Sequence, residues 1–375
     1  MSTAPTFPSG NWSYQTRIVS SNPNSTYFGY TVAISGNYAL VSYRDKHDRA
    51  PRFIGVVDVL KRNGQTWTPQ AKLTSPDQND ELFGKSLAIS GDHAVVGTSG
   101  AAYVYSRNGQ AWTRNAKLTG DPNQPNDGFG LTVAIDGDTI VVGAANWTNG
   151  GQIDHSGAAY VFGRNGTQWS QLDILTANDP DTGSDFGCSV AISGDHILIG
   201  ASWADSGAAY VFGRNGTKWS QPDILTADDP QPYSGFGSSV AISGDHILIG
   251  ASGLLDQRGA AYVFGRSGTK WSQVDKLTAD AKNPSVHFGY SVAIDGDTAV
   301  VGKFLNGPVY VFQLDQQTWT KKAELNNGKD PHPFNDTFGQ SVAISGDDVL
   351  VGASHDSQSS AYHQSALRGA AYVFN

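Results

Sequence analysis

The sequence has a single cysteine, Cys188, a single methionine, Met1, and only two glutamates, Glu81 and Glu324, among its 375 residues. One cysteine cannot form an internal disulfide, so the fold has to be held together by its core. Cys188 lies beside an apolar strand pattern, which favours packing over a reactive thiol. Because Asp is a turn residue and Glu favours helices, an acidic content that is almost all Asp disfavours a helical fold.

Long apolar runs and an excess of positive charge are also missing. No run of eighteen apolar residues occurs, so we expect no membrane span. The first ten residues, MSTAPTFPSG, lack the apolar segment of a secretory signal peptide. The net charge of -9 argues against a nucleic-acid or anionic-membrane partner. These absences leave two localisations open, the cytoplasm or export by a route that the sequence does not show.

A repeat of about fifty residues occupies nearly the whole chain. Each copy starts with a Phe-Gly pair, followed by a run such as SVAISGD, an apolar run such as HILIGA, then GAAYVF and a strand with a tryptophan. Fourteen consecutive residues, SVAISGDHILIGAS, are identical at 189–202 and 239–252. The seven Phe-Gly pairs begin at Phe28, Phe83, Phe129, Phe186, Phe236, Phe288 and Phe338.

Each copy predicts four short strands, which we call A to D in chain order. Strand A is SVAI, strand B is HILIGA, strand C is GAAYVF and strand D carries the tryptophan. Ser-Gly-Asp between A and B, and Asn-Gly between C and D, are tight hairpin turns because glycine and asparagine accept a positive φ. The repeat-locked tryptophan of strand D is best explained as a packing wedge at the blade rim, and the alternative is a sugar-stacking platform between blades. His93, His196 and His246 after the A–B turn recur with the repeat, which favours a structural role for them.

Strand B is apolar on nearly every residue, which indicates that both of its faces are covered. Four-stranded sheets that stack face to face in a ring form a β-propeller. We therefore predict one all-β domain over 1–375, a seven-bladed propeller of four-stranded antiparallel blades. The last copy ends after its strand C, and residues 11–19 match a strand D, so we expect the N-terminal strand to complete the last blade and close the ring.

The Phe-Gly pair before strand A and the Gly-Ala pair after strand B resemble FG-GAP repeats, which form the propeller of the integrin α-subunit. The resemblance implies a seven-bladed propeller used for recognition or adhesion. Integrin-type repeats often carry an Asp-x-Asp-x-Asp-Gly calcium loop between strands A and B. Here that connection is only a short turn such as Asp136-Gly137-Asp138, which offers too few oxygens for calcium. We expect neither a metal nor a cofactor, and the proline of GAP is also replaced.

The connections predict which face binds a partner. The A–B and C–D turns share one face and are monotonous, whereas the B–C and D–A loops share the other face and vary in length and sequence. Binding residues concentrate on loops held by a rigid scaffold. Aromatic, histidine and arginine side chains that the repeat does not require fall on these loops, and they suit a sugar or a peptide. The candidate ligand-binding residues are Tyr43, Arg44, Trp147, His155, Trp203, Tyr233, His332, Tyr362 and His363.

Three functions are compatible with this pattern. The first is a non-enzymatic recognition or adhesion propeller, most plausibly a lectin that binds a glycan or glycoprotein on the variable loops or between blades. The second is a scaffold that binds a protein surface. The third is a carbohydrate-active enzyme, although the sequence has no Gly-x-Ser-x-Gly, His-Glu-x-x-His or phosphate-binding loop. We expect no catalytic residue, and the oligomeric state and the ligand stay open.

Overall fold

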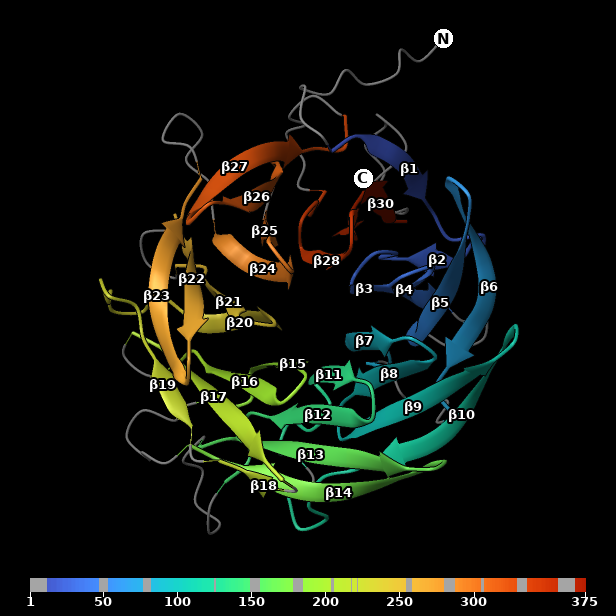
Figure 1. Ribbon diagram of the computed structural model, residues 1–375. Helices are drawn as coiled ribbons and strands as arrows, with labels where there is room; N and C mark the ends of the chain where they lie inside the picture. Colours follow the sequence, from blue (N-terminus) through green and yellow to red (C-terminus); the bar gives the residue numbers. More distant parts are fainter. Residues whose placement is uncertain are drawn as a thin grey trace.

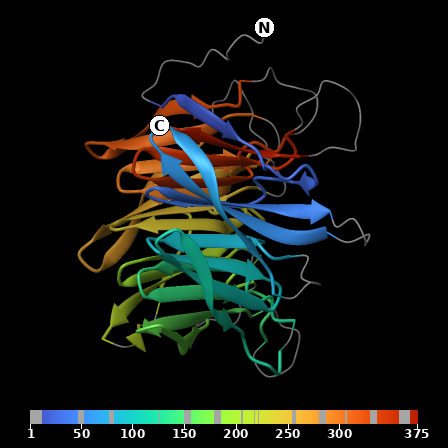
Figure 2. The ribbon, with the colours of Figure 1, turned by 90° about the vertical axis from the view of Figure 1, so that its right-hand side faces the viewer.

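The computed structural model describes residues 12–46, 53–76, 82–124, 126–148, 156–177, 185–203, 206–216, 218–220, 222–253, 258–279, 287–304, 307–328, 336–356 and 368–375. These residues form seven antiparallel sheets arranged in a closed ring (Figure 1). Edge-on, the sheets lie one above another and their tight hairpin turns project on one side (Figure 2). The predicted seven-bladed all-β propeller is confirmed.

Each blade runs from the centre of the ring outward in the order A, B, C, D. The strands of blades 1 to 3 are β3 (Val32–Ser35), β4 (Tyr38–Lys46), β5 (Phe53–Asn63) and β6 (Thr66–Thr74); β7 (Ser86–Ser90), β8 (His93–Thr98), β9 (Ala101–Asn108) and β10 (Ala111–Leu118); and β11 (Thr132–Asp136), β12 (Thr139–Ala144), β13 (Ala158–Asn165) and β14 (Gln168–Leu175). A short strand, β2 (Ser25–Thr26), also pairs with β4.

The remaining blades repeat this order. Their strands are β15 (Ser189–Ser193), β16 (His196–Ala201), β17 (Ala208–Asn215), β18 (Lys218–Trp219) and β19 (Asp223–Leu225) in blade 4; β20 (Phe236–Ser243), β21 (His246–Ala251), β22 (Ala260–Ser267) and β23 (Lys270–Leu277) in blade 5; β24 (Phe288–Asp295), β25 (Thr298–Lys303), β26 (Val309–Asp315) and β27 (Thr318–Leu325) in blade 6; and β28 (Ser341–Ser345), β29 (Asp348–Ala353), β30 (Ala370–Phe374) and β1 (Tyr14–Ile18) in blade 7. In blade 4 strand D is divided, and Pro222, which has no N–H to donate, lies between its two parts.

The hydrophobic core lies between the blades. Seven clusters of buried side chains each combine residues from two neighbouring blades, one cluster for each interface of the ring. Strands B and C are buried along nearly their whole length, whereas strand D alternates. The tryptophans of strand D belong to these clusters or pack against them, and Trp169, Trp271 and Trp319 contact His93, His196 and His246 of the preceding blade. The wedge interpretation is confirmed.

The Phe-Gly pair anchors each blade to its neighbour. Every phenylalanine of the pair is buried and packs on a tyrosine ring of its own blade, with centroids 5.1–5.8 Å apart. Every following glycine has a positive φ near 90°. At Gly29, a Cβ atom would lie 2.1 Å from the carbonyl oxygen of Ala370 in the preceding blade. Only glycine satisfies both the backbone angle and this close approach.

A closed ring of hydrogen bonds links the seven A–B turns. In each turn the glycine N–H donates to the side chain that ends strand A of the preceding blade. Blade 3 provides an example, because Gly137 donates to the Ser90 hydroxyl of blade 2 at 3.2 Å. The ring is completed where Gly36 of blade 1 donates to Ser345 of blade 7 at 3.0 Å. The other links have the same form. Ser-Gly-Asp is therefore a joint between blades as well as a turn.

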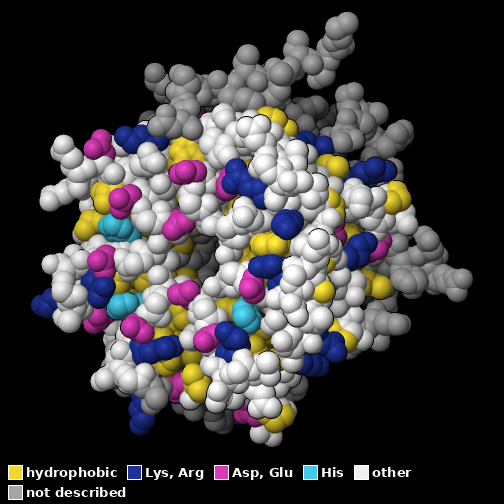
Figure 3. Space-filling view, turned by 45° about the vertical axis from the view of Figure 1, so that its right-hand side comes forward, with side chains coloured by type: hydrophobic (Ala, Val, Ile, Leu, Met, Phe, Trp, Pro, Cys, Tyr) yellow, Lys and Arg dark blue, Asp and Glu magenta, His cyan; other side chains and the backbone are white. Residues whose placement is uncertain are grey.

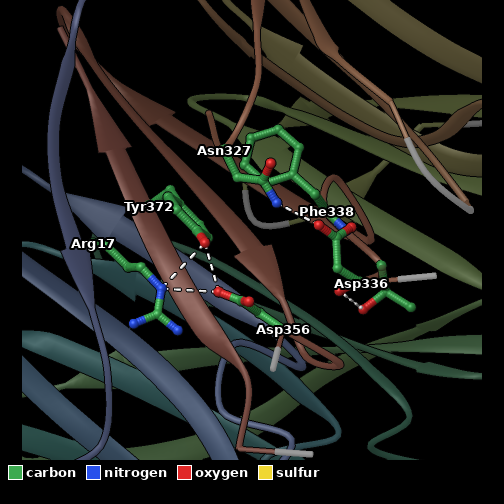
Figure 4. Close-up of polar contacts among 7 residues, drawn as sticks. Arg17, Asn327, Asp336, Phe338, Asp356 and Tyr372 are labelled. Carbon is green, nitrogen blue, oxygen red and sulfur yellow. Dashed lines mark hydrogen bonds and ion pairs between the residues drawn. The ribbon is translucent and has the colours of Figure 1, made fainter. Parts of the chain in front are cut away.

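Blade 7 is closed by the N-terminal strand, as predicted. Strand β1 pairs antiparallel with β30, and the backbones of Ser13 and Asn375 exchange hydrogen bonds of 2.7 and 3.1 Å. Beside this seam, Asp356 is fully buried and accepts from Arg17 Nε at 2.9 Å and from the Tyr372 hydroxyl at 2.5 Å (Figure 4). Burial and the neighbouring Asp356 carboxylate raise the pKa of Tyr372, so its hydroxyl stays protonated and donates.

Candidate functional site

The face that carries the A–B and C–D turns, here called the turn face, is repetitive in structure as well as in sequence. In blades 2 to 5 an arginine at the end of strand C pairs with the aspartate of the Ser-Gly-Asp or Asp-Gly-Asp turn in the same blade. Basic and acidic side chains are consequently interspersed around the central hollow (Figure 3). These charges are neutralised locally in blades 2 to 5. The closure of the ring differs, because a pocket of about 600 Å³ there is lined by Trp12, Arg62, Asp347 and Asp348. The pairs are Arg107–Asp92, Arg164–Asp138, Arg214–Asp195 and Arg266–Asp245.

The opposite face, here called the variable-loop face, carries the B–C and D–A connections. Trp203 follows strand B of blade 4, and Tyr233 lies on the D–A connection into blade 5. The hydroxyl of Ser234 donates to the carbonyl oxygen of Ser206 at 2.8 Å, which fastens these two loops to each other. Trp203 is 72% exposed and Tyr233 is 59% exposed, more than any other large apolar side chain in the described ranges. The structure thus places both candidate residues on the variable-loop face with their rings exposed.

The backbone holds Tyr233 in an unfavourable conformation. Its φ is 57°, in the left-handed region, where a bulky residue costs on the order of 1–2 kcal/mol. Other D–A loops also contain a non-glycine residue with a positive φ, such as Tyr27 and His287. In those loops it is the residue directly before the Phe of the Phe-Gly pair. That position belongs to the repeat, whereas Tyr233 lies three residues before Phe236. The repeat therefore does not account for the conformation that exposes this ring.

Tyr233 is one of the residues that line a pocket of about 370 Å³ on blade 5. Polar groups from Gln231, Ser234, Arg258 and Thr278 line it together with the Tyr262 ring and Lys276. At its rim, Lys276 Nζ donates to Asp229 Oδ2 at 2.5 Å, and the Tyr262 hydroxyl donates to Asp229 Oδ1 at 3.1 Å. The Lys276 hydrogen bond lowers the pKa of Asp229, so the carboxylate stays ionised and can accept hydrogen bonds.

A second cluster of aromatic and basic side chains lies where the innermost strands of blades 1 and 2 begin. We call Tyr27, Tyr30, Arg44 and Lys85 the channel-mouth cluster. Lys85 Nζ donates to the Tyr30 hydroxyl at 2.6 Å and lies 5.0 Å from the centre of the same ring. The guanidinium carbon of Arg44 lies 5.9 Å from the centres of both the Tyr27 and the Tyr30 rings. Two cations thus share one tyrosine.

Blade 6 contributes another aromatic pair at the same level of the ring. The ring of Tyr290, which is 41% exposed, packs on Phe304 with centroids 4.9 Å apart. Burial and the neighbouring Tyr30 hydroxyl raise the pKa of Tyr290. The sequence argument missed Tyr30, Lys85 and Tyr290. Each directly follows a Phe-Gly pair. This position holds six different residue types in its seven occurrences (Tyr, Lys, Leu, Cys, Ser, Tyr, Gln), a signal inside the repeat that could have identified them.

The placement of Tyr43 corrects the sequence prediction. We expected an exposed loop residue, but β4 continues through Tyr43, which is only 1% exposed and packs on Phe28. In the other blades except blade 6, which has Lys303, this position is small, as at Ala144, and the ring comes from strand C, as at Tyr160. Blade 1 has Asp58 at that strand-C position, and the Tyr43 hydroxyl donates to Asp58 at 3.2 Å. The Tyr43 ring thus replaces the missing strand-C ring and is part of the core.

The remaining candidate ligand-binding residues lie in different environments. Arg44 is half-buried and belongs to the channel-mouth cluster, as described above. Trp147 is also half-buried and packs against the core between blades 2 and 3, with its carbonyl oxygen accepting from Gly157 N at 2.9 Å. It is therefore a support for its loop and not a freely exposed ring. His155, His332, Tyr362 and His363 lie outside the described residues.

The part of the chain that the structure describes contains neither a metal-binding cluster nor a membrane-spanning helix. No group of three or more His, Cys, Asp or Glu side chains is placed to hold a metal ion there. In the same residues no helix has the length and apolar character needed to cross a membrane. Cys188 is half-buried, and burial raises the pKa of its thiol.

These features define a seven-bladed β-propeller with one repetitive and one variable face. The chain belongs to the FG-GAP repeat family, whose model matches residues 67–111, 112–162, 169–212, 219–264, 271–312 and 319–374. The matches begin at Trp67 and leave out most of blade 1, in which Tyr43 and Asp58 depart from the repeat.

Solved structures show the same architecture. The chain is similar to the β-propeller domain of Cps50 (Swd1) from Myceliophteria thermophila, with a TM-score of 0.60 and 10% sequence identity. The similarity covers 97% of this chain and 99% of that domain. At such low identity it shows the fold alone. No curated protein matches the chain.

Proposed function

We propose that this protein is a non-enzymatic recognition propeller that binds glycans on its variable-loop face, at Trp203, Tyr233 and the adjoining pocket of blade 5. The observation that carries the proposal is the pairing of two strongly exposed aromatic rings on two loops that are bonded to each other. An exposed ring presents an apolar face on which the C–H groups of a pyranose pack, and the polar groups of the pocket suit its hydroxyls.

The polar lining suits a hydroxylated ligand such as a sugar. Lys276 and Asp229 form an ion pair at the rim, and the Arg258 guanidinium adds further hydrogen-bond donors. Gln231 offers both a donor and an acceptor, as vicinal hydroxyls require. The pocket volume of about 370 Å³ lies within the range of small-molecule sites and has room for one or two sugar residues.

Glycan-array screening followed by calorimetry with the best binder tests the proposal. We expect Trp203→Ala and Tyr233→Ala each to weaken binding by about three- to tenfold, because each removes one stacking surface. Leu172→Ala is the control, since Leu172 is also exposed but lies on the outer strand of blade 3. Absence of any glycan binding at millimolar concentration would contradict the proposal and favour a protein-binding scaffold. Turnover of a bound oligosaccharide would contradict its non-enzymatic part.

A further inference from the structure

The channel-mouth cluster is a second site, separate from the proposed glycan surface on blades 4 and 5. Arg44 and Lys85 are both half-buried, and neither has a carboxylate partner within the described ranges of the chain. The carboxylate next in sequence, Asp45, points away from Arg44 because successive strand residues alternate between faces, and it accepts from Asn22 at 2.8 Å. Two cations beside one ring repel each other, and an anion bound between them would relieve this repulsion.

The cluster is already arranged to bind. The rings of Tyr27 and Tyr30 hold the Arg44 guanidinium by cation–π contact, which limits its motion before a ligand arrives. The Tyr30 hydroxyl accepts from Lys85, so its own proton can be donated to a ligand. Arg44, Lys85 and Tyr30 together present two cationic donors and a hydroxyl, and none of the described carboxylates lies between them. Such a set suits a carboxylate.

The space beside these donors decides which kind of carboxylate fits. Tyr30, Arg44 and Lys85 line a pocket of about 20 Å³, whose walls include Leu82 and Phe83. This volume has room for a small group such as a carboxylate but not for a sugar ring. In a uronic acid the carboxylate is attached directly to the ring, whereas Asp and Glu carry it on a flexible methylene stem. The apolar walls suit that stem.

We propose that the channel-mouth cluster binds an aspartate or glutamate side chain of an acidic peptide segment in a partner protein. Arg44 and Lys85 bind the carboxylate, Tyr30 donates the third hydrogen bond, and Leu82 and Phe83 contact the methylene groups. The ligand belongs to a protein, so this inference does not depend on glycan binding at Trp203 and Tyr233.

Fluorescence anisotropy with labelled hexaglutamate tests the proposal, with hexaglutamine and trigalacturonic acid as the comparison probes. We expect the full-length protein to bind hexaglutamate and neither comparison probe. The double variant Arg44→Gln/Lys85→Met is expected to weaken hexaglutamate binding by at least about tenfold, because it removes the charged donors. The matched control is Arg114→Gln/Lys117→Met, which removes an arginine and a lysine that also lie over one tyrosine, Tyr103, on the outer strand of blade 2. The control should bind hexaglutamate like the unmodified protein.

A second measurement on the unmodified protein does not depend on the folding of any variant. Amine acetylation read by mass spectrometry should show that hexaglutamate protects Lys85 but not Lys117. The proposal is overturned by equal weakening in the two double variants, which would indicate binding through general charge. It is also overturned if Lys85 is not protected, or if trigalacturonic acid binds the cluster in place of hexaglutamate, which would assign the cluster to an acidic sugar.

Discussion

The next-to-last residue of strand B is a glycine, and its lack of a side chain lets neighbouring blades approach closely. At Gly143 a Cβ atom would lie 2.1 Å from the carbonyl oxygen of Gly187 in the next blade and 2.2 Å from Thr132 Oγ1. The Thr132 hydroxyl donates to that same carbonyl oxygen at 2.9 Å. The two blades therefore meet backbone to backbone, with a hydrogen bond across the contact.

We predict that Gly143→Ala lowers the free energy of unfolding by about 2–3 kcal/mol, because the added methyl group has to push two blades apart. Gly137→Asn in the A–B turn of the same blade is the control. A Cβ there meets nothing within 4 Å, and asparagine tolerates the positive φ of 53°. Urea denaturation of both variants checks the prediction, and an equal loss in the two would contradict it.

At the same scale, the sequence was sufficient for some candidate residues and not for others. Trp203 and Tyr233 could be predicted to be exposed because no repeat position requires an aromatic side chain there. Tyr43 could not be placed, because a side chain on strand B substitutes for one on strand C, and this exchange is visible only when the two strands are paired. Lys85 was not predicted as a binding residue because it directly follows the Phe83-Gly84 pair, whose structural role explains that stretch of sequence.

At the scale of strands, blade 1 shows that the buried tyrosine side chain can come from strand B instead of strand C. In blade 3, Ala144 on strand B faces the space filled by Tyr160 from strand C. In blade 1, Tyr43 from strand B fills this space and Asp58 occupies the strand-C position. In both blade 1 and blade 2 a lysine lies over the ring. Lys72 Nζ is 5.8 Å from the centre of the Tyr43 ring in blade 1, and Lys117 Nζ is 5.8 Å from the centre of the Tyr103 ring in blade 2.

This exchange predicts a strong coupling between the two positions. Tyr43→Ala should cost about 3 kcal/mol, because it leaves a cavity and removes the partner of the Asp58 carboxylate. Asp58→Tyr should cost about 1–3 kcal/mol by overpacking. The double variant restores the pattern of the other blades, so we expect it to unfold within about 1 kcal/mol of the unmodified protein. Additive losses in a double-mutant cycle, measured by chemical denaturation, would rule out the proposed substitution of one ring for the other.

At the scale of the whole molecule, the architecture followed from the sequence almost completely. Seven copies of one unit, each too small to bury its own sheet faces, leave the ring as the arrangement that covers both faces of every strand B. The pairing of β1 with β30 was predictable because Trp12 has the sequence context of strand D. Repetition could not indicate where a ligand binds, because a site depends on the residues that differ between copies.

Removal of β1 should expose the edge of β30 and its unpaired backbone groups. We predict that a variant lacking residues 1–19 is insoluble or forms larger oligomers than the unmodified protein, whereas one lacking residues 1–11 behaves like the unmodified protein because β1 (Tyr14–Ile18) is intact. Size-exclusion chromatography with light scattering distinguishes the two. A folded protein without residues 1–19 that keeps the oligomeric state of the unmodified protein would show that closure by β1 is dispensable.

The ring of hydrogen bonds between the A–B turns also limits how this gene can evolve. Residues 189–202 and 239–252 are identical and lie fifty positions apart, the length of one blade. Unequal recombination within the corresponding DNA would delete a whole blade in frame. The six-bladed product would have to bend every joint between turns more sharply, since a closed ring has no free end at which to relax. A loop can lengthen one codon at a time, but the copy number of the repeat can change only if all joints change together.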